Sequence, residues 1–223
     1  MDPIEDLRQF VVAHPAVNNP FLDRFRGADI GDDEFRLFAT QFFAFVKHFP
    51  RILAALLANT SDDEAADELA TILASELGDG NPKRRHEYLY HNFLRSIGME
   101  PRDAARAPWL DSTTAYIDGL AALYGHADPM VALGASFGLE HMAIPMWDQL
   151  IPGIERVRAT REPFAAMDTF YWTFHRDIEE HHEDSMDRAL EHLPAESFDR
   201  LRAGAAGALD LLAGFWDGLD RAA

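Results

Sequence analysis

Residues 174–184 read Phe-His-Arg-Asp-Ile-Glu-Glu-His-His-Glu-Asp, in the middle of a long stretch with helical periodicity. Since an α-helix turns about 100° per residue, placing His175 at zero puts Glu179 near 40° and His182 near −20°. Two imidazoles and a carboxylate therefore point the same way within about 60° of arc. This mixture of nitrogen and oxygen ligands suits iron, manganese or zinc. The segment predicts a metal site on one helix face.

The same face carries large side chains, which indicates that it packs inward. Asp168, Tyr171, Trp172, Ile178 and Met186 fall on or near it. Two histidines and one carboxylate are enough for a single non-haem iron with open positions for O2 and substrate. A binuclear site needs further carboxylates from other helices. Acidic residues in other apolar helices are therefore the next candidates.

The chain as a whole predicts one all-α domain, residues 1–223, of about seven or eight helices. Strand signals are nearly absent, whereas helix-initiating and helix-ending residues recur throughout. Ser61 and Glu64 have the spacing of a capping box, and Pro50 predicts a kink in a long apolar helix. The predicted helices run from about residue 2 to 14, from 20 for a short piece, and over about 32–59, 61–78, 81–98, 112–125, 128–150 and 162–193, with a final amphipathic helix after Pro194.

The chain is strongly acidic, with a formal net charge of −18 over 223 residues, and it has no cysteine. An acidic surface disfavours nucleic acid and anionic membranes as partners. The absence of cysteine excludes thiolate metal ligands and thiol nucleophiles. No secretory signal and no run of about 18 apolar residues is evident. We therefore expect a cytoplasmic protein without a membrane span, whose partners are a small-molecule substrate and a second copy of the chain.

Glu140 is the leading carboxylate outside the first segment, because most of its neighbours in residues 137–147 are apolar. A buried carboxylate is costly unless a cation, an arginine or a proton compensates it. His141 is displaced from Glu140 by about 100° on a helix, so the two do not easily serve one centre. Glu140 is the expected metal ligand. The alternatives are a structural ion pair at Glu140 and ligation by His141 in its place.

Glu76 and His86 flank a glycine-rich break, Gly78-Asp-Gly80. The backbone between them must be irregular, and its local stability is expected to be low. Taken alone, this stretch is better explained as an ordinary loop that carries a solvated glutamate and histidine. Glu76 and His86 become candidate site residues only together with the segments around Glu140 and around His175 to His182.

Together the three segments resemble the haem-oxygenase-like diiron oxidases and oxygenases, iron-containing redox enzymes in the broader TenA/PqqC-like group that includes thiaminase II. That family's pattern is a Glu, a His on the third core helix, a lone Glu on a later helix, and His-x3-Asp/Glu-x2-His near the end. The resemblance covers most of the chain, since residues 19–25 and 38–46 are similar to the group's opening helices. The matching residues are, in order, Glu76, His86, Glu140, His175, Glu179 and His182.

The resemblance implies a haem-oxygenase-like fold and two Fe(II) ions per chain, with O2 as co-substrate. It also implies that the third core helix is labile and orders as metal binds. We expect tighter metal loading on the continuous helix of residues 174–184 than beside the glycine break. The resemblance divides the ligands between the two irons: Glu76, His86 and a shared Glu140 for one, and His175, Glu179 and His182 for the other. It does not settle which carboxylates bridge the irons.

Two departures from the family narrow the expected chemistry. Several N-oxygenating members carry an extra carboxylate on the preceding core helix, whereas residues 35–61 here contain no Asp or Glu. A branch that consumes its own tyrosine has Tyr immediately before the lone Glu, whereas this chain has Leu139. The sequence thus favours desaturation, oxidative decarboxylation or C–C cleavage of a small carboxylate-bearing or apolar metabolite. The candidates to bind a substrate carboxylate are Lys83, Arg84, Arg85, Arg176 and His181.

Other interpretations compete with a diiron enzyme. A cofactor-independent PqqC-like oxidase would use His and Arg side chains to bind an anionic substrate and O2, and a non-catalytic metal-binding helical protein is the non-enzymatic alternative. Thiaminase II-like hydrolysis usually relies on a cysteine, which this chain lacks. A ferritin-like bundle normally shows two Glu-x-x-His motifs, and only Glu179-Glu-His-His182 fits.

Overall fold

The computed structural model describes residues 2–222 and contains, over this range, ten α-helices, three short 3-10 helices and no β-strand. The fold is therefore all-α, as predicted. The helices are α1 (Pro3–Val12), α2 (Pro20–Arg26), α3 (Asp32–Asn59), α4 (Asp63–Glu76), η1 (Pro82–Arg84), α5 (His86–Ser96), α6 (Pro101–Ala104), α7 (Asp111–Tyr124), α8 (Pro129–Thr160), η2 (Glu162–Phe164), α9 (Phe170–Glu191), η3 (Ala195–Ser197) and α10 (Phe198–Arg221).

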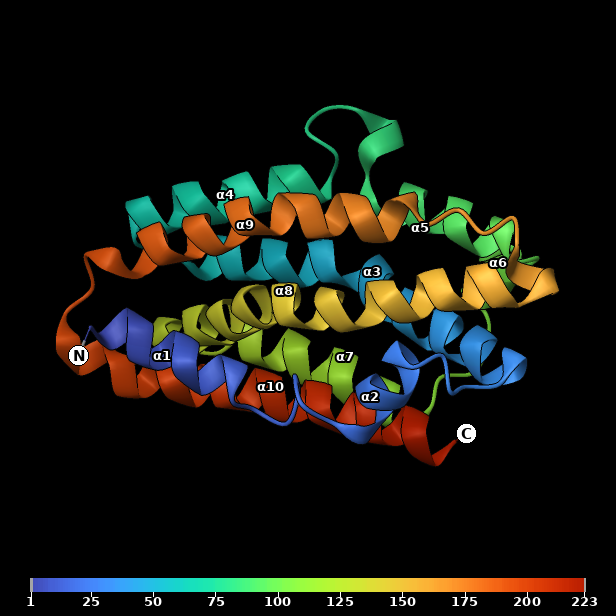
Figure 1. Ribbon diagram of the computed structural model, residues 1–223. Coiled ribbons are helices and arrows are strands. Elements are labelled where there is room, and N and C mark those ends of the chain that lie inside the picture. Colours follow the sequence, from blue (N-terminus) through green and yellow to red (C-terminus); the bar gives the residue numbers. More distant parts are fainter. Residues whose placement is uncertain (1, 223) are drawn as a thin grey trace.

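The long helices are stacked in layers with α8 at the centre (Figure 1). α4 and α9 run side by side on one face, α3 and α8 lie beneath them, and α7 and α10 lie on the opposite face. α8 packs against α9 on one side and against α10 on the other. α8 and α10 approach closely through glycines, because a Cβ on Gly134 would collide with the backbone of Leu201 and one on Gly204 with the backbone of Val131. The other side of α8 is left to face α9.

Aromatic side chains fill the space between α3, α8 and α9. The Phe42 and Trp147 rings lie 6.0 Å apart, and Trp172 of α9 lies 5.9 Å from Trp147 and 5.6 Å from Phe42, measured between ring centroids. All three side chains are buried. Aromatic pairs in such geometry stabilise a core by about 0.5–1.5 kcal/mol beyond the area that they bury. The aromatic side chains of α3 therefore form part of the core. Two of them, Phe45 and Phe49, also line a cavity.

The start of α4 differs from the sequence prediction. The predicted capping box at Ser61 is wrong, because α4 begins at Asp63 and its N-cap is Asp62. The Asp62 carboxylate accepts a hydrogen bond from the backbone N–H of Ala65 at 2.9 Å. Asp is as good an N-cap as Ser, so residue type alone does not decide between Ser61 and the adjacent Asp62.

α8 also differs, since it continues ten residues beyond Leu150, where the sequence predicted an end. Pro152 removes a helix hydrogen-bond donor, but packing compensates for the loss. Gly153 lies so close to Phe25 that an added Cβ would collide with the Phe25 backbone, and Ile154 and Val157 are buried. Tertiary contacts therefore override the local helix-breaking signal.

Two predicted helices begin later than expected. The predicted helix from residue 81 starts as the separate 3-10 turn η1, and α5 begins at His86. The predicted helix from residue 162 starts as η2, and α9 begins at Phe170. In both places a proline follows the N-terminal residue of the segment, and the 3-10 turn that it initiates does not propagate.

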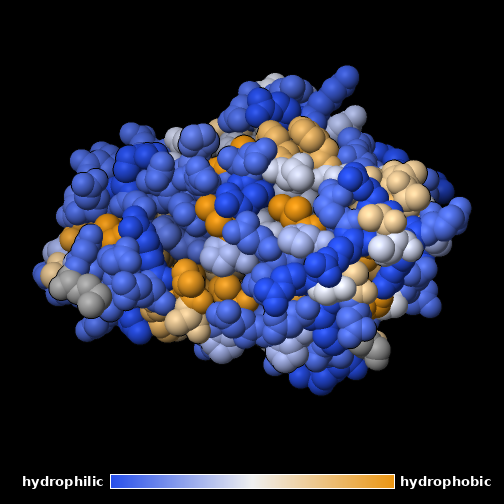
Figure 2. Space-filling view, viewed as in Figure 1, coloured by the Kyte–Doolittle hydropathy of each residue, from blue (hydrophilic) through white to orange (hydrophobic). Residues whose placement is uncertain are grey.

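The viewed face of the molecule is largely hydrophilic, with small apolar patches (Figure 2), as a charge of −18 leads one to expect. Among the described helices, α3 is long and apolar enough to cross a membrane by length and composition, which differs from the expectation that no such stretch occurs. Half of its most apolar window is buried inside the fold. A buried core helix meets the same criterion.

Candidate metal centre

A tight turn brings the end of α4 and the start of α5 together. Glu76 is the last residue of α4 and His86 the first of α5. Between them, Gly78, Asp79 and Gly80 have φ values of 87°, 51° and 79°. A Cβ on Gly78 would lie 2.5 Å from the Asn81 carbonyl oxygen. Only glycine therefore allows the chain to turn back and place the His86 imidazole against the Glu76 carboxylate.

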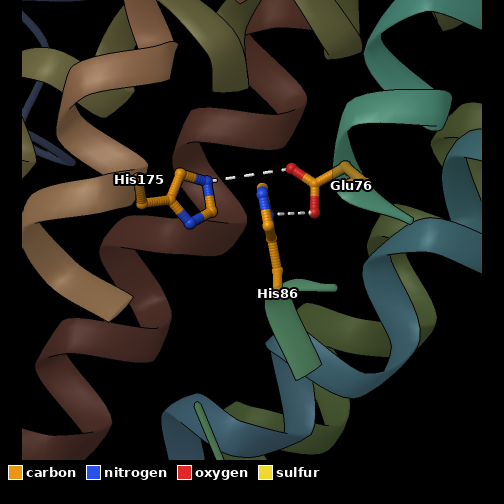
Figure 3. A group of neighbouring side chains, drawn as sticks. All are labelled: Glu76, His86 and His175. Carbon is orange, nitrogen blue, oxygen red and sulfur yellow. Dashed lines mark ion pairs between the residues drawn. The ribbon is translucent and has the colours of Figure 1, made fainter. Parts of the chain in front are cut away.

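The first group of candidate ligands consists of Glu76, His86 and His175 (Figure 3). The Glu76 carboxylate faces both imidazoles, with Oε2 2.7 Å from His86 Nδ1 and Oε1 3.7 Å from His175 Nε2. The two imidazole centroids are 4.3 Å apart. All three residues are buried, at no more than 8% exposure. This group spans α4, α5 and α9.

The second group consists of Glu140 on α8 with Glu179 and His182 on α9. His182 Nδ1 lies 3.4 Å from Glu140 Oε2 and 3.9 Å from Glu179 Oε1. Both supporting helices are long and continuous at these positions. The second group is therefore held without any loop, unlike the first.

Glu179 lies between the two groups. Its Oε1 faces His182, whereas its Oε2 lies 3.5 Å from His175 Nε2. The structure thus brings all six predicted ligands into one cluster but divides them differently from the sequence-based expectation, because His175 joins Glu76 and His86. The helical wheel explains the difference. It gives direction around the axis only, and seven residues separate His175 from His182 by about 10 Å along the axis.

Two polar side chains outside the predicted set contact the cluster. Trp147 Nε1 donates a hydrogen bond to Glu179 Oε2 at 3.3 Å. The Ser75 hydroxyl lies 3.0 Å from His182 Nε2. Sequence reasoning missed both residues. Ser75 adjoins a predicted ligand, and Trp147 follows Glu140 by seven residues on the same helix face, so position alone was the available signal.

Burial and mutual charge shift the titration of these groups. Burial acts to raise the pKa of Glu76, but His86, His175 and His182 together lower it to about 2. Burial and the neighbouring His86 hold the pKa of His175 well below its usual value. Burial, with the carboxylates of Glu140 and Glu76, raises the pKa of Glu179 far above its usual range. A third buried carboxylate is therefore costly in this cluster unless a cation compensates it.

The donor set fits metal cations. Buried polar atoms are normally hydrogen-bonded, yet Glu140 Oε1, His175 Nδ1, His182 Nδ1 and both His86 nitrogens are buried without a hydrogen-bond partner. His86 Nδ1 and Glu76 Oε2 approach to 2.7 Å without hydrogen-bond geometry, as two ligands of one ion do. Three glutamates and three histidines are the N/O ligands that iron, manganese and zinc take. Two divalent cations would offset the three carboxylates.

A narrow cavity with a free volume of about 30 Å³ adjoins both groups. Five of the six candidate ligands line it, and His182 is the one that does not. Apart from these ligands, none of the described residues that line the cavity is charged. The remaining lining residues are Phe45, Val46 and Phe49 of α3, Leu139, Met142, Ala143, Met146 and Trp147 of α8, and Tyr171 of α9.

His141, the alternative to Glu140, points away from the cluster. Its ring stacks on Phe137 with centroids 3.8 Å apart, and its Nε2 lies 3.1 Å from Asp187 Oδ1. Asp187 also pairs with Arg8. The substrate-binding candidates lie outside the cavity as well: Arg176 pairs with Asp148, and Lys83, Arg84, Arg85 and His181 are exposed.

Residues 36–213 match the family described as iron-containing redox enzyme, and the chain belongs to this family. It is also similar to 4-chloro-allylglycine synthase of Streptantibioticus cattleyicolor, with 24% identity over 211 residues that cover 94% of this chain and 79% of the relative. A CadD-like protein of unknown function from Nostoc punctiforme has the same fold, with a TM-score of 0.82, 17% identity, and coverage of 99% of this chain and 96% of that one.

A TenA homologue from Pseudomonas syringae pv. tomato also shares the fold, with a TM-score of 0.78, 14% identity, and coverage of 98% and 91% of the two chains. Together these comparisons confirm the resemblance and the haem-oxygenase-like helical fold.

Proposed function

We propose that the protein is a non-haem diiron, O2-dependent oxidase or oxygenase that acts on a small aliphatic carboxylate, with an amino acid as the first substrate class to test. The observation that carries this proposal is the opening of two buried Glu/His groups onto one apolar cavity. Membership of an iron-containing redox family supports iron as the metal.

Each ligand group has a defined part in this proposal. The first group, Glu76, His86 and His175, would hold one Fe(II), and the second group would hold the other, with Glu179 facing both. Bound Fe(II) would supply the electrons that reduce O2 and so allow oxidation of a substrate C–H bond. Trp147 restrains Glu179 through its hydrogen bond. The apolar walls exclude water from the reacting atoms.

The cavity points to the substrate class. Its free volume of about 30 Å³ is far smaller than that of an ordinary ligand pocket, which disfavours a bulky polycyclic substrate. No described Lys or Arg lines it, so an aliphatic portion of the substrate would occupy the interior. The relative's name, 4-chloro-allylglycine synthase, specifies an amino acid product. The α3 face that lines the cavity carries Phe45, Val46 and Phe49 in place of an extra carboxylate, which supports carbon oxidation over N-oxygenation.

The same cavity argues against a cofactor-independent PqqC-like oxidase. Such an enzyme would bind its anionic substrate through cationic side chains, and the described lining offers none besides histidines of the ligand groups. A non-catalytic metal-binding protein would not need an apolar cavity beside its ligands. The diiron enzyme accounts for both features.

The test is an O2-consumption screen of anaerobically Fe(II)-loaded protein with short aliphatic amino acids and carboxylic acids, with products identified by mass spectrometry. Substrate-dependent O2 uptake and a desaturated, decarboxylated or cleaved product are expected. Ala143→Leu should lower kcat/KM most for the longest substrates by filling the cavity, while the near-isosteric Met142→Leu serves as control. Fe(II)-loaded protein that consumes no O2 with any member of the panel would contradict the proposed substrate class.

A further inference from the structure

The last turn of α4 contacts both ligand groups through two consecutive residues. Glu76 belongs to the first group. Ser75, immediately before it, places its hydroxyl 3.0 Å from Nε2 of His182, a member of the second group. The bond joins α4 to α9 next to the cluster. No other residue described in α4 has a side-chain hydrogen bond to a candidate ligand.

The Ser75 contact engages Nε2 of His182 and leaves Nδ1 as the nitrogen that faces the carboxylates. His182 Nδ1 faces Glu140 Oε2 at 3.4 Å and is buried without a hydrogen-bond partner. An imidazole binds metal through a nitrogen that carries no proton, and its other N–H usually donates to an oxygen. When the Ser75 hydroxyl accepts from Nε2–H, Nδ1 is left as the ligand atom and the contact restrains the ring.

Ser75 also holds the turn that leads to His86. Its carbonyl oxygen accepts a hydrogen bond from the N–H of Gly78 at 2.8 Å, and the Ala74 carbonyl accepts one from Asp79 at 2.8 Å. These bonds close the left-handed turn between Glu76 and His86. One residue therefore supports the turn of the first group through its backbone and a ligand of the second group through its side chain.

We propose that Ser75 is a positioning residue that couples the two metal positions, an inference that rests on the proposed diiron centre. A metal on the second group fixes His182, and His182 then holds Ser75 and the end of α4 in place. Glu76 and His86 are thereby presented for the second ion. Because coupling between two binding events is reciprocal, a metal on the first group strengthens the second to the same degree.

The test is an anaerobic titration of the apo full-length chain with Co(II), followed by absorption spectroscopy and calorimetry. Ser75→Ala should weaken Co(II) binding at the second group about 10- to 100-fold. This is the range for loss of an outer-shell partner of a metal-binding histidine. Ser75→Thr keeps a hydroxyl and should restore the wild-type isotherm. Thr71→Ala is the matched control, since Thr71 is an exposed hydroxyl residue one turn earlier in α4 whose Oγ1 bonds only to Asp67.

A double-mutant cycle with Glu76→Gln isolates the coupling. With the first group disabled, the affinity penalty of Ser75→Ala at the second group should be about 3- to 10-fold smaller than in the wild-type background. An equal penalty in both backgrounds, or unchanged affinities in Ser75→Ala, would overturn the coupling and leave the metal centre intact. A wild-type chain that binds no Co(II) would overturn both this inference and the proposed function.

Discussion

His175 Nε2 lies 3.7 Å from Glu76 Oε1, which joins α9 to the last residue of α4. This contact places His175 in the group of Glu76 and His86, whereas Glu179, one turn further along α9, reaches both groups. α9 therefore contributes to both groups of candidate ligands at successive turns.

Replacing His175 should empty one position and spare the other. After anaerobic reconstitution and desalting, His175→Ala should retain about one Fe(II) where the wild type retains two, because Glu140, Glu179 and His182 remain intact. The double variant with Glu76→Gln should also retain about one, because both residues serve the same ion. Loss of all iron in the double variant would instead support the division expected from sequence, in which the two residues serve different ions.

The two positions should differ in affinity, with the second group tighter because it stands on the continuous helices α8 and α9. Gly78→Ala should weaken the first group selectively and lower the free energy of unfolding by at least about 2 kcal/mol, through its positive φ and the 2.5 Å contact of the new Cβ with Asn81. Gly80→Ala is the control, with a φ of 79° but nothing within 4 Å, and should cost only about 1–2 kcal/mol. Stepwise Fe(II) titration and urea denaturation measure both effects, and equal iron affinities in the two variants would argue against the role of the turn.

The Trp147 hydrogen bond to Glu179 should matter for metal binding more than for folding. Trp147→Phe removes the donor and should weaken Fe(II) binding about 10-fold or more. Trp172→Phe makes the same change of ring at a buried tryptophan whose Nε1 has no partner. The two variants should lose similar stability, and only Trp147→Phe should lose iron affinity. Parallel losses of iron in both would assign the effect to packing.

Asp187 should stabilise the fold in a pH-dependent way. Burial acts to raise its pKa, but hydrogen bonds from His141 and Arg8 outweigh burial and lower it. A carboxyl whose pKa is lower in the folded state contributes stability above its unfolded pKa, about 3.9, and loses the contribution as pH falls through the folded value. Asp187→Asn should therefore cost about 1–2 kcal/mol at pH 7 and progressively less towards pH 3. Urea denaturation across this range measures the difference, and a constant cost would contradict an ionic role.

The sequence predicted the fold well where local signals agree with tertiary packing. Asp2, Asn19 and Asp128, each followed by proline, mark three helix starts that the structure shows. The signals failed where two similar caps adjoin, at Ser61 and Asp62, and where packing against Phe25 carries α8 through Pro152. In the first case chemistry does not distinguish the residues, and in the second the deciding contact is remote in sequence.

For the candidate site too, the sequence predicted what local signals determine and missed what depends on contacts between helices. The six predicted residues do lie together. Burying a Glu or His in an apolar core is costly unless the group is paired, and these residues can pair with one another. Their division into two groups depends on the position of each side chain along α9, which periodicity does not give. Ser75 and Trp147 act through contacts between helices, and such contacts leave no pattern in a single chain.

The number of Fe(II) ions retained per chain after anaerobic reconstitution and desalting tests the central claim most directly. We expect two for the wild type and about one for each of Glu76→Gln and Glu140→Gln, since each variant disables one group. Retention of no iron by the folded wild-type chain, or of two ions by both variants, would contradict a binuclear centre built from these residues.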